Sequence, residues 1–176
     1  MKPQKASDCS LKKSDNMNNK LFLVCPFSCM EIYIRQKFGD NVFFISAMAA
    51  VLRFDRDDIS AIKQFIEREK IQKILIAGDT SCRFINGVLK NEKGFESYGE
   101  SLIKNIVLEN KDTLSKACSE LEKQKIITKS LIVNQLQEIC SPDYFLSEIL
   151  HNGLRIGGII TTKSRNELTE FDFNNN

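Results

Sequence analysis

Two cysteines follow two short apolar runs that have the character of buried strands. Cys25 comes directly after LFLV at 21–24, and Cys82 follows ILIA at 74–77 after a short turn. In open α/β sheets, ligands collect outside the carboxyl ends of the strands, so two thiolates placed there could share one metal ion. The positions of these two cysteines therefore indicate a zinc site at one edge of a sheet.

The segments around the two cysteines alternate between strand and helix patterns. The stretch 55–70, for example, carries Ile59, Ile62 and Ile66 at helical spacing behind a group of aspartates. This alternation predicts an α/β fold with a mainly parallel central sheet flanked by helices. Strands are expected at 21–25, 41–45, 71–77 and 154–162, and helices at 30–38, 55–70, from about Cys82, at 100–124, 130–140 and 141–153.

Length and composition fit one domain. The 176 residues are 42% hydrophobic, and residues 1–20 form a polar, Lys- and Asn-rich stretch that we expect to be a flexible tail before a single domain at 21–176. The tail carries a charge of +3 and the rest −1, so a nucleic-acid surface is not expected. With no apolar run near the ~20 residues of a membrane span and no secretory signal, we expect a cytoplasmic protein whose six cysteines are thiols or metal ligands.

Several segments, in the right order, resemble the β-carbonic anhydrases. In that family a zinc cysteine at a strand end is followed two residues later by Asp and four residues later by Arg, and a later strand ends in Gly-His-x-x-Cys. The resemblance spans about residues 21–173, which is more specific than any single motif. It is carried by LVCPFSC at 23–29, GDNVFF at 39–44, the strand and turn at 74–82, and the stretch 131–162 with Gln135-Leu136, Ser141-Pro142 and GLRIGG at 153–158.

The resemblance implies a zinc lyase that hydrates CO2 to bicarbonate. Carried over by position, the zinc ligands are Cys25, Asp79 in place of the family's histidine, and Cys82, with Cys29 as a candidate fourth ligand. Zinc accepts sulfur and carboxylate oxygen, so this set is chemically permissible. It places three negative charges on the ion where the family places two, however, which makes bound water less acidic.

The family's proton-handling groups are replaced. Phe27 and Cys29 stand at the positions of its Asp/Arg pair, which orients the attacking group. Such an oriented acceptor is worth on the order of 10²-fold in rate. ISAM at 45–48 stands where the family reads Arg-Asn-Ala-Gly, so the expected pocket is lined by Phe27, Ser46 and Ala47. Weak or no CO2 hydration is the prediction.

Each candidate group also has a structural interpretation. Free cysteines are often buried as small apolar side chains, which would account for Cys25 and Cys82 without a metal. Asp79 could cap the following helix, and Cys29 could be an inert helix residue. His151, the only histidine, sits where it would complement a helix dipole, so a Ser/His or Cys/His catalytic arrangement is the less favoured interpretation.

Three hypotheses follow. The first is a β-carbonic-anhydrase-like protein with a degraded site, with or without zinc, that acts in binding or assembly as a homodimer or larger homo-oligomer. The second is a working zinc lyase that uses Cys25, Asp79 and Cys82 on CO2 or a related small substrate. The third is a redox or metal sensor built from Cys25, Cys29 and Cys82.

Overall fold

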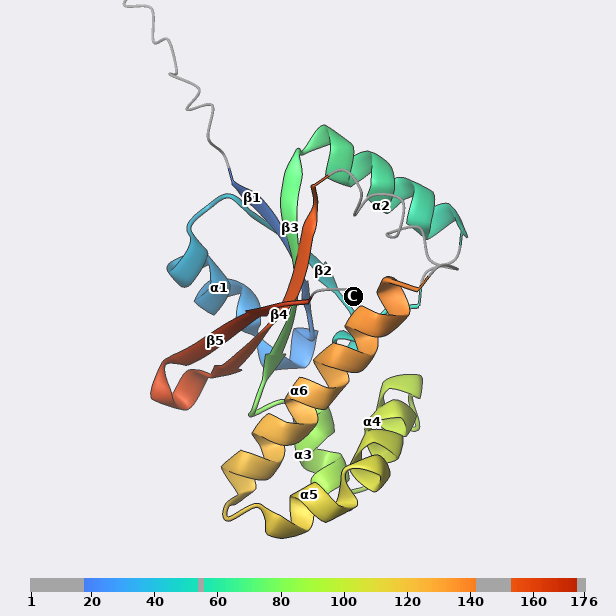
Figure 1. Cartoon of the computed structure of the whole chain (residues 1–176), viewed down its shortest axis with the longest axis vertical. Helices are drawn as coiled ribbons and strands as arrows, with labels where there is room; N and C mark the ends of the chain where they lie inside the picture. The colour runs from blue at the N-terminus through green and yellow to red at the C-terminus, as the bar shows by residue number, and fades with distance from the viewer. Residues whose placement is uncertain (1–17, 54–55, 142–152, 174–176) are drawn as a thin grey trace, which may run out of the picture.

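The structure is a computed structural model, and it describes residues 18–53, 56–141 and 153–173. Its centre is a five-stranded sheet in the order β2-β1-β3-β4-β5 (Figure 1). Strands β1 to β4 are parallel to one another, and β5 pairs antiparallel with β4 at one edge. The predicted α/β class with a mainly parallel sheet is confirmed. The strands are β1 (Asn19–Val24), β2 (Val42–Ser46), β3 (Ile71–Asp79), β4 (Arg155–Thr162) and β5 (Glu167–Asp172).

The predicted elements of the first half agree closely with the observed ones. Helix α1 has the predicted bounds, and α2 covers most of the expected 55–70 helix. Strand β1 begins at Asn19, so the last two residues of the expected tail belong to the sheet. The helices are α1 (Met30–Phe38), α2 (Arg56–Arg68), α3 (Arg83–Leu89), α4 (Tyr98–Glu109), α5 (Lys111–Lys116) and α6 (Glu120–Ile139), with short 3-10 turns η1 (Pro26–Ser28), η2 (Met48–Ala50) and η3 (Lys163–Arg165).

The prediction of one long helix over 100–124 is wrong. The chain forms α4, breaks at Asn110, forms the short α5 and begins again at Glu120. Ser119 caps α6 by accepting a hydrogen bond from the Glu122 amide at 3.2 Å, and the Glu122 carboxylate accepts one from the Cys118 amide at 2.7 Å. These local caps start a new helix within a polar stretch that has no Gly or Pro. The segments expected at 100–124 and 130–140 are thus three helices, and the helix expected at 141–153 lies almost wholly outside the described residues.

Strand β5 was not predicted, and it packs very closely on β4. A Cβ on Gly157 would lie 2.3 Å from the Phe171 carbonyl oxygen, and one on Gly158 would lie 2.5 Å from the Phe171 ring. Only glycine permits this approach. Buried Lys73 of β3 bonds to the carboxylates of Glu170 at 2.6 Å and Asp172 at 2.5 Å, so ion pairs also hold the edge strand.

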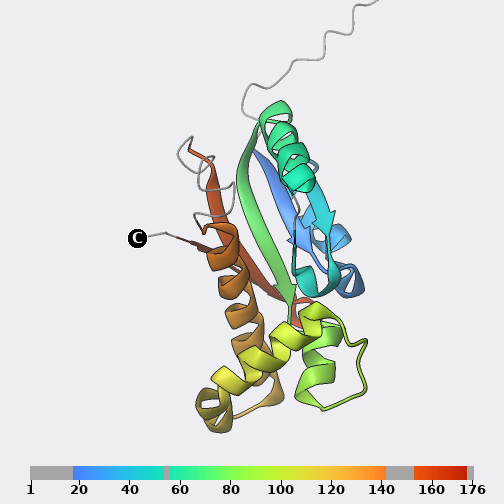
Figure 2. The same ribbon diagram turned by 90° about the vertical axis from the view of Figure 1, so that its right-hand side faces the viewer.

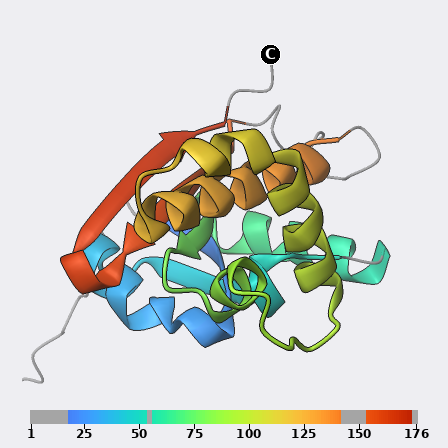
Figure 3. The same cartoon turned by 90° about the horizontal axis from the view of Figure 1, so that it is seen from below.

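The strands contribute alternate residues to cores on the two faces of the sheet. Leu21 and Leu23 of β1 join one core with α2, α3, α4 and α6, and Phe22 and Val24 join a smaller core with α1. Helix α6 runs along the sheet, as the side view shows (Figure 2). Helices α3, α4 and α5 gather beyond the carboxyl end of β3 (Figures 1 and 3). The carboxyl ends of β1 and β3 therefore point toward a helical cap that α3, α4 and α5 form.

Candidate functional site

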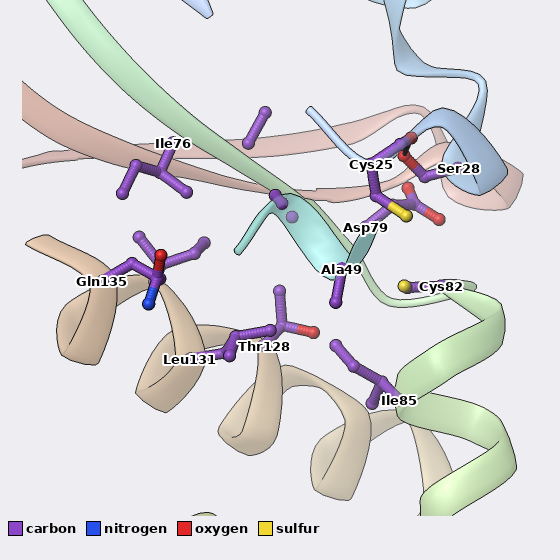
Figure 4. A pocket seen from close by; sticks show the side chains of 14 residues that line it. Cys25, Ser28, Ala49, Ile76, Asp79, Cys82, Ile85, Thr128, Leu131 and Gln135 are labelled. Atoms are coloured by element: carbon purple, nitrogen blue, oxygen red, sulfur yellow. Dashed lines mark hydrogen bonds between the residues drawn. The ribbon is translucent and has the colours of Figure 1, made fainter. Parts of the chain in front are cut away.

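The carboxyl ends of β1 and β3 lie side by side, because Val24 and Ala77 are partners in the parallel ladder. Cys25 directly follows β1, Asp79 is the last residue of β3, and Cys82 is the N-cap of α3. All three line one small, largely apolar cavity of about 10 Å³, closed on its far side by α6 (Figure 4). The fold therefore brings together the three residues singled out as zinc ligands.

The two thiols influence each other's ionisation. Both are free and buried, at 3% and 4% exposure for Cys25 and Cys82. The hydrogen bond with Cys82 is the main cause that lowers the pKa of the Cys25 thiol to about 6, against the opposing effect of burial. The same hydrogen bond, together with burial, raises the pKa of Cys82. Of the two thiols, Cys25 therefore gives up its proton more readily than Cys82.

Backbone amides near the two sulfur atoms also act on the pKa values of the thiols. Those of Phe27, Ser28 and Ala49 in the η1 and η2 turns lower the pKa of Cys25, and those of Phe84 and Ile85 in the first turn of α3 oppose the rise in the pKa of Cys82. Turn η2 reaches this position with Ala49 and Ala50 both at φ 57°, a left-handed conformation that costs of order 1 kcal/mol or more for a residue with a side chain.

The Asp79 carboxylate is engaged differently, by four donors of the protein. Its Oδ1 accepts the Ser81 amide at 2.9 Å and the Ser81 hydroxyl, and its Oδ2 accepts the Thr161 hydroxyl at 2.5 Å and the Lys163 amide at 3.3 Å. Asp79 is 1% exposed. The carboxylate thus ties the end of β3 to the end of β4 and the turn after it. The bond to the Ser81 amide agrees with the capping interpretation, although α3 itself begins four residues later.

These contacts bear on whether the residues fit a zinc ion. Zinc takes four ligands in a tetrahedron, and structural and catalytic sites supply at least three of them from the protein. Among the described residues no three Cys, His, Asp or Glu side chains are grouped so that they could hold a metal ion. Asp79 lies near the thiols, but its oxygens already accept four hydrogen bonds. The two thiols are therefore a two-donor set, which does not fit a tetrahedral zinc.

The positions of the family's Asp/Arg pair hold groups turned away from this cavity. Phe27 is 45% exposed and packs edge-on against Phe84, with ring centroids 5.4 Å apart, and against Phe95 at 5.9 Å. We call Phe27, Phe84 and Phe95 the aromatic cluster. Cys29 is exposed, and its thiol contacts the Pro26 carbonyl at 3.7 Å. The structure does not bring Cys29 to the thiol pair.

The structure places all three expected pocket residues outside the lining of this cavity. Phe27, Ser46 and Ala47 do not line the cavity, and Ser46 instead faces outward with its hydroxyl 3.5 Å from Glu31. The chain turns at η2, so that Ala49 and Ala50 face the thiols in their place. Among the residues lining this cavity there is no arginine, lysine or histidine, and His151 lies outside the described residues.

Sequence reasoning missed Thr161 and Lys163, which complete the Asp79 network. They lie 82 and 84 residues further along the chain, and nothing in their local pattern marks them. Lys163 also reaches across with its ammonium to the Ser28 carbonyl. Only the pairing of β3 with β4, in which Asp79 faces Thr161, brings these groups together.

In the part of the chain that the structure describes, no helix combines the length and apolar character needed to cross a membrane. No protein-family model matches the sequence, and no curated protein matches it.

Solved structures of β-carbonic anhydrases do match. CafD of Aspergillus fumigatus superposes with a TM-score of 0.72 at 16% identity, covering 90% of this chain and 92% of CafD. A tetrameric enzyme of Sordaria macrospora gives 0.69 at 18%, covering 88% and 81%. The Coccomyxa enzyme in complex with acetazolamide gives 0.68 at 16%, covering 88% and 72%. The chain therefore has the β-carbonic anhydrase fold, as its sequence predicted.

Proposed function

We propose that this chain is a β-carbonic-anhydrase-like protein whose site no longer hydrates CO2 and which acts by binding or assembly. The single observation that carries the proposal is the Asp79 carboxylate, which stands at the family's histidine position with four protein donors bound to it. A ligand in that state would have to break buried hydrogen bonds to reach a metal. Each such bond to a charged group is worth about 1.5–3 kcal/mol.

The second support is that the positions of the family's Asp/Arg pair contribute no side chain to the lining of the cavity in the described structure. Phe27 belongs to the aromatic cluster and Cys29 is exposed at the start of α1. Neither can accept and orient a hydrogen bond as a carboxylate held by a guanidinium does. Loss of that arrangement alone is worth on the order of 10²-fold in rate.

A stopped-flow CO2 hydration assay with a pH indicator tests the proposal. The protein, supplied with zinc, is compared at equal concentration with an active enzyme of the same fold. We expect a rate indistinguishable from the uncatalysed reaction. Turnover within about tenfold of the active enzyme would overturn the proposal, and elemental analysis of the same sample reports how much zinc it holds.

A working zinc lyase is the second candidate function. It is favoured by the placement of Cys25, Asp79 and Cys82 around one cavity at the carboxyl edge of the sheet. It requires Asp79 to leave its present partners for the metal. A Thr161→Val variant distinguishes the two: if Asp79 is a ligand, removing a competing donor raises zinc occupancy, whereas in our proposal occupancy stays low and stability falls.

For the assembly role we propose a homo-oligomer, dimer or larger, with an interface near the site. Four large side chains on η1, η2 and the loop and start of α4 are about half exposed, and these elements contact one another. The likeness to the tetrameric Sordaria macrospora enzyme supports the same assembly. The four residues are Phe27, Met48, Phe95 and Tyr98.

Light scattering after size-exclusion chromatography measures the assembly. Met48→Glu places a charge in the proposed interface and should reduce the molar mass to that of a monomer. Leu108→Glu is the matched control, because Leu108 is 70% exposed on α4, outside the proposed patch. An equal effect of both substitutions, or a monomeric wild type, would exclude this interface.

A further inference from the structure

A groove separate from the cavity at Cys25 lies between α6 and the hairpin of β4 and β5. Helix α6 packs on β3 and β4, and β5 lies beyond β4 at the edge of the sheet (Figure 1). The groove has a volume of about 220 Å³, and its walls come from α6, β4 and β5. It shares no lining residue with the cavity at Cys25, so it is a different site on the molecule.

Part of the lining of this groove is apolar. Ile126 of α6 and Ile160 of β4 both line it, and both side chains are partly buried where they pack against the larger core. A water molecule occupies about 30 Å³ in the liquid, so about 220 Å³ corresponds to a ligand of about seven or eight non-hydrogen atoms. The size and the apolar surface therefore fit a small molecule with a short aliphatic body.

The charged residues of the lining leave one cation without a partner. Lys125 of α6 bonds to Glu167 of β5 at 3.0 Å, and this ion pair joins the two walls of the groove. Lys129 lies one helical turn further along α6 and also lines the groove. In the described part of the chain Lys129 has no ion-pair partner. One ammonium group is therefore available beside the apolar surface.

The balance of charge decides which anion fits. Two lysines and one glutamate give the lining a net charge of +1, and Glu167 would repel a second negative charge on a ligand. Among the described lining residues there is no arginine to hold a phosphate with two parallel hydrogen bonds. A monoanion with an apolar body matches both the charge and the surface.

We propose that this groove binds a small aliphatic monocarboxylate, of which a straight-chain acid of about six carbons is the simplest form. The Lys129 ammonium binds the carboxylate in a charge-assisted hydrogen bond. The chain covers Ile126 and Ile160 and removes their apolar surface from water. The groove lies apart from the cavity at Cys25, so its occupancy does not depend on the proposed function.

A nuclear magnetic resonance titration of the full chain with hexanoate tests the proposal. Hexan-1-ol keeps the chain without the charge, and acetate keeps the charge without the chain. Lys129→Met removes the ammonium group from an exposed side chain and keeps its apolar stem. Lys123→Met is the matched control, because Lys123 is on the same helix, pairs with Glu120 and lies outside the lining of the groove.

We expect saturable shifts of the Ile126 and Ile160 methyl signals, with a dissociation constant on the order of 1 mM. Hexan-1-ol and acetate should each bind at least about fivefold more weakly than hexanoate, because each lacks one of the two interactions. Hexanoate should bind Lys129→Met at least about fivefold more weakly than the wild type. Lys123→Met should bind hexanoate as the wild type does.

Four results would overturn the proposal. They are shifts that do not saturate or that fall outside the groove, an equal loss in Lys123→Met and Lys129→Met, equal binding of hexan-1-ol and hexanoate, and tighter binding of a short peptide ending in leucine than of hexanoate. The last result would assign the groove to a protein partner. The CO2 hydration assay reports on the cavity at Cys25, so activity there would refute the proposed function and leave this proposal unchanged.

Discussion

Two acidic features border the same cavity, and they differ in what holds them. The Asp79 carboxylate is bound by four donors from its own loop, from β4 and from the turn after β4. The pKa values of the Cys25 and Cys82 thiols are shifted by the other thiol, by burial and by nearby backbone amides. Both features are at least 96% buried. The carboxylate is therefore engaged by the strands and turns around it, whereas no other side chain is a cause of the shifted pKa of either thiol.

The difference shows that a residue's position in the fold does not by itself make its side chain a metal ligand. Cys25, Asp79 and Cys82 occupy the three places where the family resemblance puts zinc ligands, and the fold brings them together. What separates them is the hydrogen-bonding capacity that each has left. A carboxylate that already accepts four hydrogen bonds has little capacity left for a metal.

Removal of the carboxylate is expected to have the largest effect. Asp79→Ala leaves the hydroxyl of Thr161 and the amides of Ser81 and Lys163 without their acceptor, so we expect a loss of about 3–4 kcal/mol in the free energy of unfolding. Urea denaturation followed by circular dichroism measures it. Asp79→Asn keeps one acceptor oxygen and should cost roughly half as much. A loss below about 1 kcal/mol for the alanine variant would mean that the carboxylate is not structural.

The ionisation of the thiol pair should instead be measurable in a pH titration. Because the pKa of Cys25 is lowered to about 6, its thiolate is present above that pH and is lost as the pH falls through it. The ultraviolet thiolate absorbance of the wild type should exceed that of Cys25→Ser by one thiolate at about pH 7.5, and the difference should vanish by about pH 5. A midpoint near the ordinary cysteine value of about 8.5 would contradict the lowered pKa of Cys25.

Cys82→Ala should cost little stability, in contrast to Asp79→Ala. The side chain is small and behaves as a small apolar group, so we expect a loss of about 1 kcal/mol in the free energy of unfolding. Cys140→Ala, at the same 4% exposure, is the matched control and should lose about as much. If Cys82→Ala were as damaging as Asp79→Ala, the distinction between the two features would fail.

The smallest effect is expected for a carboxylate at the surface. Asp172 bonds to Lys73, whose hydrogen bond and charge lower the pKa of the Asp172 carboxyl, but its side chain is 58% exposed. Its contribution is present above the ordinary aspartate pKa and is lost as the pH falls through the lower folded-state value. Asp172→Asn should therefore cost less than about 1 kcal/mol at neutral pH and nothing in acid. Unfolding measured at both pH values checks this, and a cost equal to that of Asp79→Asn would remove the contrast.

Much of the sheet was predictable because its strands are apolar runs. The runs at 21–24 and 74–77 are buried on both faces between helices, which is why they read as continuous hydrophobic segments. Strand β5 was missed because Leu168 and Phe171 pack on opposite faces of the edge and the residues between them are polar. The break between α4 and α6 was missed because Asn110 and Ser119 interrupt a charged stretch without any strong helix breaker.

The site was predictable only as far as the strand ends. That Cys25, Asp79 and Cys82 meet follows from two adjacent parallel strands, which the pattern predicts. The state of Asp79 depends on Thr161 and Lys163, which reach it through strand pairing over more than 80 residues. The cavity wall depends on Ala49 and Ala50, which adopt a left-handed turn that their residue types do not predict.

The Asp79 network also limits which residue type can stand at the end of β3. A histidine there could not accept from two hydroxyls and two amides at once, so it would leave several buried donors unsatisfied. Exchange of this one carboxylate for an imidazole would therefore require compensating changes on β4 and in the turn after it.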